Sequence, residues 1–259
     1  ESTRSKIAEL QKEEGIVTIL AQEPSEKATM LMERYDLVAL PVVDSEQKLV
    51  GRITIDDAVD SIIEDAERDY QLASGISEDV ESSDSVITLT RARLPWLLIG
   101  LIGGIGGAYV IGWFDIKENV EMALFIPLIA AMGGNVGVQS AAIVVQGLAS
   151  SHINTNNLLR RLSKELGVGI LNGLICGLII LGVTLLLNFG VALSITVSLA
   201  LLCVIIFAAL FGTFVPLMLH RYNIDPALAT GPFITTVNDI IGLMIYFAVG
   251  SLISGLILG

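Results

Sequence analysis

The residue with the clearest chemical potential is Asp239, the one carboxylate in the apolar stretch 235-TTVNDIIGLMIYF-247. A charge near the centre of a membrane-spanning helix costs about 2.5–3.5 kcal/mol on insertion scales, so it normally faces a bundle interior or water and often marks an ion or proton path. At helical spacing, the same face carries Thr235, Thr236, Gly242 and Tyr246. We expect this face to line a wet passage. The alternative is a carboxylic acid kept neutral by burial or bonded to a neighbouring helix.

The stretch 127-PLIAAMGGNVGVQSAAIVVQG-147 offers neutral oxygens to complete a cation site. Its run 133-GGNVG-137 predicts an irregular backbone, which a membrane tolerates only where it is buried or lines a cavity. Close packing by the glycines is the alternative. Asn135, Gln139 and Ser140 would supply amide and hydroxyl oxygens. Such ligands suit a hard cation such as Mg²⁺, and a twofold dimer would bring two Asp239 carboxylates to it.

Five segments are apolar over a length that crosses a bilayer. They are residues 94–114, 122–149, 166–189, 193–219 and 227–258. Connections on one side carry basic residues, namely Arg91, Arg93, Arg160, Arg161, Lys164 and Arg221. By the positive-inside rule, the segment before the first span is cytoplasmic and the C-terminus lies outside. We expect the first span, rather than a cleaved leader, to direct insertion.

Composition divides the chain into two unlike parts. Of its 259 residues 53% are hydrophobic and only 16% charged, which excludes an ordinary soluble domain. Residues 1–93 hold 21 of the 27 acidic and 10 of the 15 basic residues, so an acidic soluble region precedes an apolar one. Cys176 and Cys203 lie in apolar runs, and we assign them neither a disulfide nor a metal.

The soluble region follows a strand, helix, strand, strand, helix pattern over residues 16–62. Ser25 is the expected N-cap of the first helix, and the β-rich runs 37–44 and 48–55 are joined by a polar turn. Asp56 or Asp57 is expected to start the second helix.

The segment from Asp56 to Asp84 holds eleven acidic residues and one basic residue, Arg68. Like charges at i,i+4 are unfavourable in a helix, and divalent ions would screen or bridge them. We interpret the segment as a Mg²⁺ sensor and gate; a plainly solvated linker is the alternative. The acidic residues proposed for the sensor are Asp56, Asp57, Asp60, Glu64 and Glu67.

The stretches 127-PLIAAMGGNVGVQSA-141 and 225-DPALATGPFITTVNDIIGLMIYF-247, behind an acidic region, resemble the MgtE family of magnesium channels. The resemblance implies a pore at a homodimer interface, with hydrated Mg²⁺ bound at Asp239. It further implies a cytoplasmic domain that closes the pore when internal Mg²⁺ is high. Carried over, the surroundings of the pore site are Gly134, Asn135 and Thr235, with Asp225 at the cytoplasmic mouth.

The soluble region resembles a single CBS (cystathionine-β-synthase) motif, which implies pairing with a second copy across a dimer. Its Gly51, Thr54 and Asp57 resemble the signature with which adenosine-binding CBS motifs hold a ribose, so ATP is a candidate ligand. The same Thr54 and Asp57 serve equally well as a helix cap.

The expected fold is an α-helical membrane protein with five transmembrane helices per subunit, preceded by a small α/β CBS-type cytoplasmic domain. The boundaries are 1–62 for that domain, 63–93 for an acidic connecting helix and 94–259 for the pore domain. The expected partners are a second subunit, membrane lipid, Mg²⁺ or other divalent cations, and ATP, but no nucleic acid.

The expected function is Mg²⁺-selective uptake across the plasma membrane, gated by intracellular Mg²⁺. A proton- or sodium-coupled secondary transporter of divalent cations is the alternative, although such proteins usually show two related halves. We do not expect an enzyme. An intramembrane aspartyl hydrolase needs two carboxylates that share a proton, and the predicted spans embed only Asp239.

Overall fold

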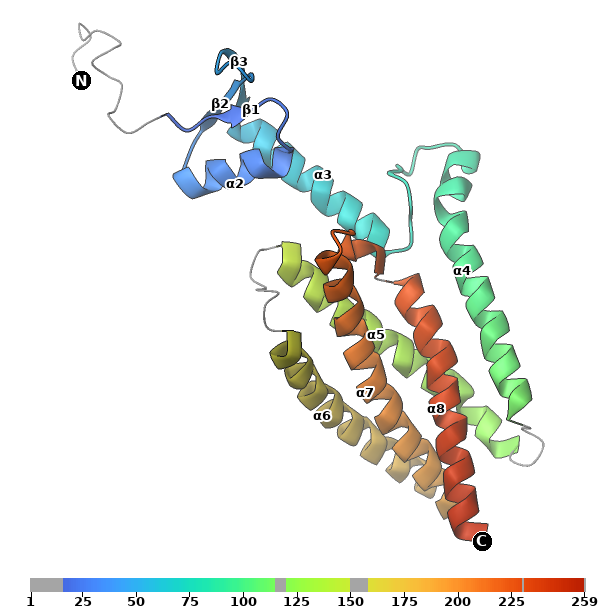
Figure 1. Cartoon of the computed structure of the whole chain (residues 1–259). Helices are drawn as coiled ribbons and strands as arrows, with labels where there is room; N and C mark the ends of the chain where they lie inside the picture. Colours follow the sequence, from blue (N-terminus) through green and yellow to red (C-terminus); the bar gives the residue numbers. More distant parts are fainter. Residues whose placement is uncertain (1–15, 115–119, 150–157, 230, 259) are drawn as a thin grey trace, which may run out of the picture. The chain divides into compact units, whose positions relative to one another are not determined.

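The computed structural model describes residues 16–114, 120–149, 158–229 and 231–258, drawn in colour in Figure 1. The chain divides into two compact units, Glu1–Arg68 and Asp69–Gly259. The second unit contains five helices that are long and apolar enough to cross a membrane. The predicted fold class, with five spans behind a small mixed α/β domain, is therefore confirmed.

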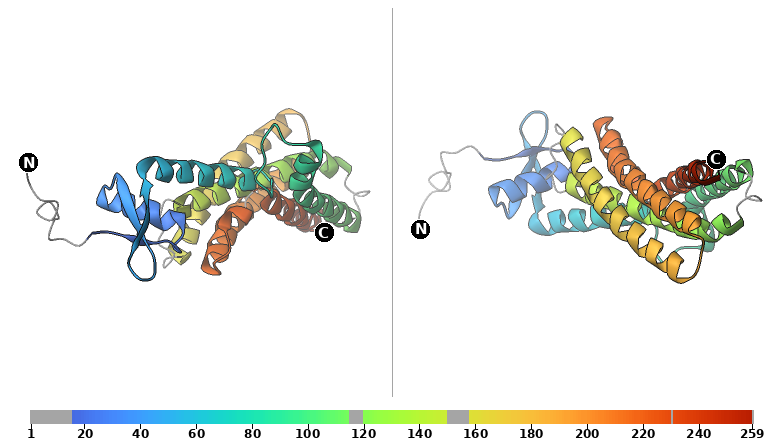
Figure 2. Two further views of the ribbon diagram at one scale, coloured as in Figure 1. Left: turned by 90° about the horizontal axis from the view of Figure 1, so that it is seen from above. Right: turned by 90° about the horizontal axis from the view of Figure 1, so that it is seen from below.

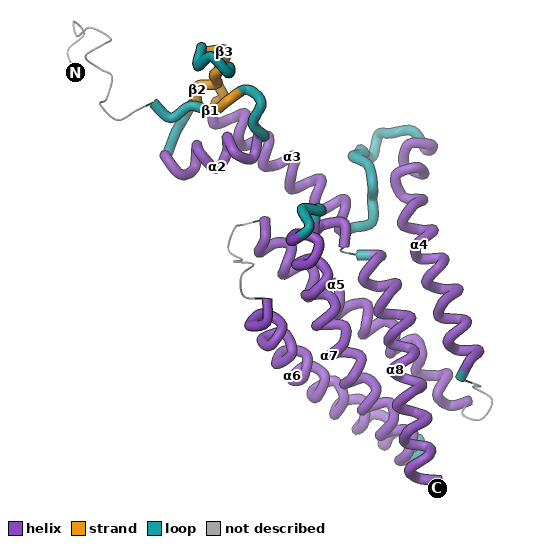
Figure 3. Tube along the Cα trace, viewed as in Figure 1, coloured by secondary structure: helices purple, strands orange, loops and turns teal. Residues whose placement is uncertain are grey.

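The first unit is built on a three-stranded sheet, visible as the orange strands of Figure 3. Strand β1 (Ile19–Leu20) pairs in parallel with β2 (Ala39–Val43), and helix α2 (Ser25–Tyr35) makes the crossover between them. Strand β3 (Leu49–Thr54) pairs antiparallel with β2 and leads into helix α3 (Ile55–Ala73). A small core closes this unit, formed by Ile19, Ala28, Met32, Leu40 and Ala58.

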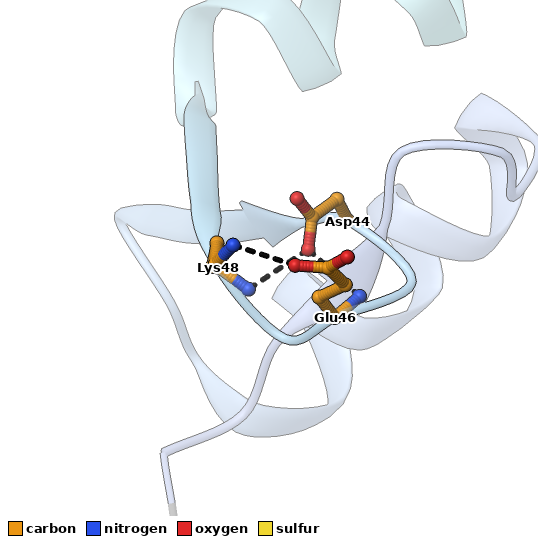
Figure 4. A network of polar contacts seen from close by, with 3 residues as sticks. All are labelled: Asp44, Glu46 and Lys48. Carbon is orange, nitrogen blue, oxygen red and sulfur yellow. Dashed lines mark hydrogen bonds and ion pairs between the residues drawn. The ribbon is translucent and has the colours of Figure 1, made fainter.

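The turn between β2 and β3 is held by its own polar side chains (Figure 4). The carboxylate of Asp44 accepts from the backbone N–H groups of Glu46 and Lys48, each at 2.9 Å. The ammonium of Lys48 lies 2.5 Å from a carboxylate oxygen of Glu46, and Gln47 adopts a positive φ of 62°. The predicted polar turn between two β-rich runs is confirmed.

Two helix starts differ from the prediction. Helix α2 begins at Ser25 itself, and Pro24 is the N-cap with φ −65° and no side-chain hydrogen bond. The fixed φ of proline suits a helix entry without a polar cap. Helix α3 begins at Ile55, one residue earlier than predicted, and Asp57 reaches back so that its carboxylate accepts from the Thr54 N–H at 2.8 Å.

The acidic connecting helix is α3, but it ends at Ala73 rather than continuing to residue 93. Gly75 takes a positive φ of 80° just beyond its end, a conformation that favours glycine and stops a helix. Residues 74–85 are then non-helical until Ser85, whose hydroxyl accepts from the Thr88 N–H at 3.2 Å and caps helix α4 (Val86–Trp113). The first spanning helix thus starts eight residues before the predicted residue 94.

The spanning helices pack around α7 (Val191–Arg221). Helices α5 (Ile126–Ala149), α6 (Leu158–Leu186) and α8 (Pro232–Leu258) all contact α7, whereas the main partner of α4 is α8. The two further views in Figure 2 show the same bundle. Short 3-10 helices, η2 (Val120–Phe125) and η4 (Pro226–Ala229), precede α5 and α8. The centre of the core lies on α7, at Val197, Ala200, Leu201, Val204 and Ile205.

Small residues allow these helices to approach closely. In α6, Gly169, Gly173 and Gly177 face the backbone of α7, and the Ser198 hydroxyl donates to the Gly177 carbonyl at 2.7 Å. In α4, Gly103 and Gly107 face Thr236 and Leu243 of α8, while a side chain on Gly104 would meet open space. Close packing through small residues is what membrane interiors favour, since apolar burial alone does not drive helices together there.

Candidate cation site

Asp239 lies two turns into α8, a helix whose start is defined by its own sequence. Gly231 has a positive φ of 61° and Pro232 opens the helix, as its missing N–H permits. The Thr235 N–H donates to the Gly231 carbonyl at 3.1 Å, and the Thr235 hydroxyl donates to the Pro232 carbonyl at 3.1 Å. Asp239 follows one turn after Thr235 and is partly buried.

The backbone of α5 comes close to this carboxylate at Gly134. A Cβ placed on Gly134 would lie 3.4 Å from Thr235 Cγ2 and 3.9 Å from Asp239 Oδ1. A larger side chain at position 134 would therefore project toward the carboxylate. The structure thus brings together three of the residues named from the sequence, Gly134, Thr235 and Asp239.

Asn135 is not joined to Asp239 by any hydrogen bond between described residues. It is exposed on α5 in a single chain, next to the buried Gly134. Ser140 is also turned elsewhere, because its hydroxyl donates to a carboxylate oxygen of Glu165 on α6 at 2.6 Å. The Ser140 hydroxyl, one of the neutral oxygens expected to serve the cation site, is therefore bonded to a different residue.

The predicted irregular backbone at 133-GGNVG-137 is wrong, because α5 is a continuous helix from Ile126 to Ala149. Its glycines serve close packing, the alternative that the sequence left open. A Cβ on Gly133 would lie 3.2 Å from Val204 Cγ1, and one on Gly137 would overlap Asn238. Tight contacts with α7 and α8 hold these glycines in a helix despite their low helical propensity.

The face of α8 that was predicted to line a passage is covered by other helices both before and after Asp239. Thr236 faces Gly103 of α4, and Gly242 packs against Val204 of α7. Tyr246 is fully buried, and its hydroxyl donates to the Met122 carbonyl at 2.9 Å. The reason is that α4, α7 and η2 cover this face, which helical periodicity alone cannot reveal.

Asn238, the residue before Asp239, is a buried polar residue that the sequence analysis does not single out. It is 1% exposed, and its amide nitrogen donates to the Gly133 carbonyl at 3.1 Å. Its other side-chain atom, Oδ1, has no partner among the described residues. The signal in the sequence is an amide side chain within an apolar span, next to the charged Asp239.

Asp225 has no hydrogen bond to these residues in the described part of the chain. It is exposed, and its carboxylate accepts from the Ala227 N–H at 2.9 Å, which caps η4. Its expected place at a cytoplasmic mouth stays a prediction.

The five acidic residues proposed for a sensor are all exposed on α3. In the part of the chain that the structure describes, no three His, Cys, Asp or Glu side chains are grouped closely enough to hold a metal. A site on α3 would therefore need water or a second surface to complete it. Cys176 and Cys203 are free thiols, each partly buried.

The Asp57 carboxylate is engaged with Thr54. It accepts from the Thr54 hydroxyl at 2.6 Å and from the Thr54 N–H at 2.8 Å. The pKa of Asp57 is lowered, chiefly because the hydroxyl bond stabilises the ionised form. The pair thus acts as a helix cap, and a ribose would have to compete with that bond.

The last turn of α3 contacts the start of α8. A side chain on Gly231 would meet the Ala73 carbonyl, and a Cβ on Gly75 would lie 2.7 Å from Pro232 Cγ. The amide of Gln71 holds the following loop, donating to the Val80 carbonyl at 3.0 Å and accepting from the Val80 N–H at 3.3 Å. The end of α3 and the residue after it therefore lie directly against the start of the helix that carries Asp239.

Comparison with known proteins gives two family matches. Residues 126–249 match MgtE, described as a divalent cation transporter, and residues 9–64 match the CBS domain. The chain is similar to proteins named magnesium transporter MgtE from Bacillus subtilis (34% identical, 91% of this chain and 53% of that protein) and Thermus thermophilus (31%, 96% and 56%). A third, from Enterococcus faecalis, is 32% identical over 92% of this chain and 53% of that protein. The chain thus spans about half the length of these curated relatives.

Proposed function

Because the chain belongs to the MgtE family, we propose that it transports Mg²⁺ across the membrane that its five helices span. In this proposal the protein is a channel of the plasma membrane rather than an enzyme. The N-terminal unit faces the cytoplasm and the C-terminus lies outside, consistent with the basic connections between spans.

The observation that carries the proposal is the juxtaposition of Asp239 with Gly134 and Thr235. A carboxylate in mid-span is costly unless it meets water or a cation. Gly134 carries no side chain that would project toward the carboxylate, and Asp239 is only partly buried, so in this proposal a hydrated ion approaches the carboxylate from its exposed side. Mg²⁺ dehydrates reluctantly and is commonly held through its water shell by one or two carboxylates.

A homodimer would complete this site. One chain supplies a single carboxylate here, and a twofold axis beside Asp239 would supply the second. Exposed apolar side chains on the N-terminal unit, Val38, Leu49 and Val50, support pairing of that unit as well.

Gating in this proposal acts through α3. Cytoplasmic Mg²⁺ would neutralise the exposed Asp56, Asp57, Asp60, Glu64 and Glu67. Mg²⁺ bound between α3 and a second acidic surface, such as the α3 of the other subunit, would hold the two surfaces together. In this state α3 would press on the start of α8 through Ala73 and Gly75. At low Mg²⁺ the like charges would repel, and the pressure would be released.

The test is Mg²⁺ flux into liposomes loaded with a fluorescent Mg²⁺ indicator, without a proton or sodium gradient. Asp239→Asn keeps the shape of the side chain and removes its charge. We expect its flux to fall by about tenfold or more, since a loss of about 1.4 kcal/mol in binding is a factor of ten. Glu165→Gln is the matched control, because it neutralises another carboxylate of the same unit. The glutamine oxygen can still accept the hydrogen bond that the Ser140 hydroxyl donates to Glu165.

The coupled transporter is separated by the same assay. Uptake that requires an imposed proton or sodium gradient would favour it over a channel. Uptake that follows the Mg²⁺ gradient alone, and that Asp239→Asn abolishes, supports the channel. Equal uptake by wild type and Asp239→Asn would contradict both.

ATP is a second candidate ligand of the N-terminal unit. The observation that favours it is the Gly51, Thr54 and Asp57 signature, although Asp57 already accepts both hydrogen bonds from Thr54. Equilibrium dialysis with labelled ATP tests it, with Asp57→Ala as the comparison. Binding that this substitution leaves unchanged would place any nucleotide elsewhere.

A further inference from the structure

Asn238 is held in a place where a polar side chain is costly. It is 1% exposed inside α8, and its Oδ1 lacks a partner among the described residues. An unsatisfied buried polar atom costs about 1–3 kcal/mol. Two hydroxyls of α7, those of Ser194 and Thr213, share this condition. Asn238 differs from them because its other atom, the amide nitrogen, bonds a neighbouring helix.

That hydrogen bond crosses from α8 to α5. The Asn238 amide donates to the Gly133 carbonyl at 3.1 Å, joining residues 105 apart in sequence. The space for it is made by two glycines of α5. A Cβ on Gly137 would overlap the Asn238 side chain, and one on Gly133 would lie 3.8 Å from Asn238 Cβ. The amide thus packs against two glycines of the facing helix.

A third helix, α7, packs closely against the same glycines of α5. A side chain on Gly212 of α7 would collide with the Gly137 backbone, and Gly133 also faces Val204 of α7. Helices α5, α7 and α8 all contact one another, and α7 packs against α5 close to the point where Asn238 bonds it. The hydrogen bond thus joins α8 to α5 at a point where the helices are closely packed.

The residues that follow each partner are those of the cation site. Gly134 follows Gly133, and Asp239 follows Asn238. Each step along a helix turns by about 100°, so fixing one pair fixes the angle between the next. At this next pair, a Cβ placed on Gly134 would lie 3.9 Å from Asp239 Oδ1.

We propose that Asn238 is the positioning residue of the cation site: its amide, bonded to the Gly133 carbonyl, sets how far Asp239 stands from the α5 backbone. The inference rests on the proposed Mg²⁺ transport and names one determinant of its affinity and selectivity. Asn238 does not contact the ion in this account. Its role is exerted through the register of two helices.

The decisive variant is Asn238→Leu, which is close to asparagine in shape and removes both the donor and the unpartnered Oδ1. Measured in liposomes with the whole chain, we expect its half-saturating Mg²⁺ concentration, or its Mg²⁺ to Ca²⁺ flux ratio, to change by about threefold to tenfold. This range corresponds to one interhelical hydrogen bond in a membrane protein. Its thermal unfolding midpoint in detergent should stay at or above that of wild type, because the unsatisfied atom is gone.

A purely structural role would lower the unfolding midpoint and leave half-saturation and selectivity unchanged, so the two measurements separate the accounts. Ser194→Ala is the matched control, since it also removes a buried, unpartnered oxygen but lies on α7. It should leave both transport parameters at their wild-type values. If Asn238→Leu does not fold, Asn238→Ser is measured instead. The serine side chain is too short to reach the Gly133 carbonyl, and it is small enough to fit between the two helices.

Wild-type half-saturation and selectivity in folded Asn238→Leu or Asn238→Ser would overturn the inference. That result leaves the proposed function intact, provided that wild type conducts and Asp239→Asn does not. Failure of wild type to take up Mg²⁺ would instead remove the proposed function itself.

Discussion

A phenolic hydroxyl buried in an apolar bundle needs one acceptor, and Tyr246 has one in the Met122 carbonyl. This bond ties α8 to η2, away from the Asp239 side chain. We therefore predict that Tyr246→Phe lowers stability by about 1 kcal/mol, the usual net value of such a bond. The measurement is the unfolding midpoint in detergent. Half-saturation for Mg²⁺ in liposomes should stay unchanged, and a shift of threefold or more would return Tyr246 to the ion path.

The crossing of α5 and α7 permits no side chain at Gly212. A Cβ there would collide with the Gly137 carbonyl, a backbone atom that cannot rotate away. We predict that Gly212→Ala destabilises the protein by about 1–3 kcal/mol, as overpacking does in well-packed cores. Gly104→Ala is the control, because a Cβ at Gly104 meets nothing within 4 Å. Equal unfolding midpoints for the two variants would contradict the tight crossing.

For single residues, the sequence reveals a side chain whose chemistry is unusual for its surroundings. It does not reveal which residues far apart in the chain lie close together in the fold. Asp239 stands out because a carboxylate in an apolar span is unusual. Asn238 does not, because its importance comes from Gly133, a residue 105 positions away in the chain. Likewise Thr236 and Tyr246 share a helical face with Asp239 but are covered by other elements, which periodicity along one helix cannot report.

Among the elements, α3 combines an amphipathic sequence with a surface of like charges. Asp56, Asp60 and Glu64 follow one another at i,i+4, and no lysine or arginine lies between them in the sequence. We predict that millimolar Mg²⁺ protects α3 from limited proteolysis. Joint substitution of Asp56, Asp60, Glu64 and Glu67 by their amides should remove that protection.

The matched control for this experiment is the double variant Glu26→Gln and Glu33→Gln on α2. Both carboxylates are exposed on a helix of the same unit but lie outside the acidic segment. Protection by Mg²⁺ should persist in this variant. Loss of protection in both variants would contradict a sensor on α3. Equal protection of the wild type in a buffer free of Mg²⁺ and Ca²⁺ would contradict it as well.

The start of α3 should depend on pH through Asp57. Its folded-state pKa is lowered by the bond from the Thr54 hydroxyl. A lowered pKa means that the cap stabilises the helix start fully above the unfolded value, about 3.9, and that this contribution is lost as pH falls through the folded value. We predict that amide hydrogen exchange at residues 55–58, corrected for intrinsic rates, loses protection below that window. Asp57→Asn should remove this step and leave α2 unaffected.

Five spans and a β-rich soluble unit were predictable because their signals are local. Apolar length decides a span, and alternation with a polar turn decides the β2 and β3 pair. The glycine run of α5 was misjudged for the opposite reason. Intrinsic propensity favours an irregular backbone there, yet Val204, Gly212 and Asn238 pack against the glycines and keep the helix intact. Tertiary contacts override propensity at such positions.

For the molecule as a whole, the proposed dimer has a consequence at Thr235. If the twofold axis runs beside Asp239, then Thr235, one turn earlier on the same face, approaches its counterpart in the second subunit. We predict that Thr235→Cys forms an intersubunit disulfide in membranes under mild oxidation. The background is a chain in which Cys176 and Cys203, the two native free thiols, are replaced by alanine.

The control is Leu171→Cys, a 60% exposed position of α6. An exposed cysteine cross-links by random collision at any position, so the comparison must be a rate at low protein density. A disulfide needs Cα atoms about 4.4–6.8 Å apart, which diffusion between separate proteins satisfies only briefly. Thr235→Cys should therefore cross-link at least about tenfold faster than Leu171→Cys, and added Mg²⁺ should slow it by occupying the axis. Equal rates would place the two carboxylates far apart and leave each Asp239 with only the oxygens of its own chain.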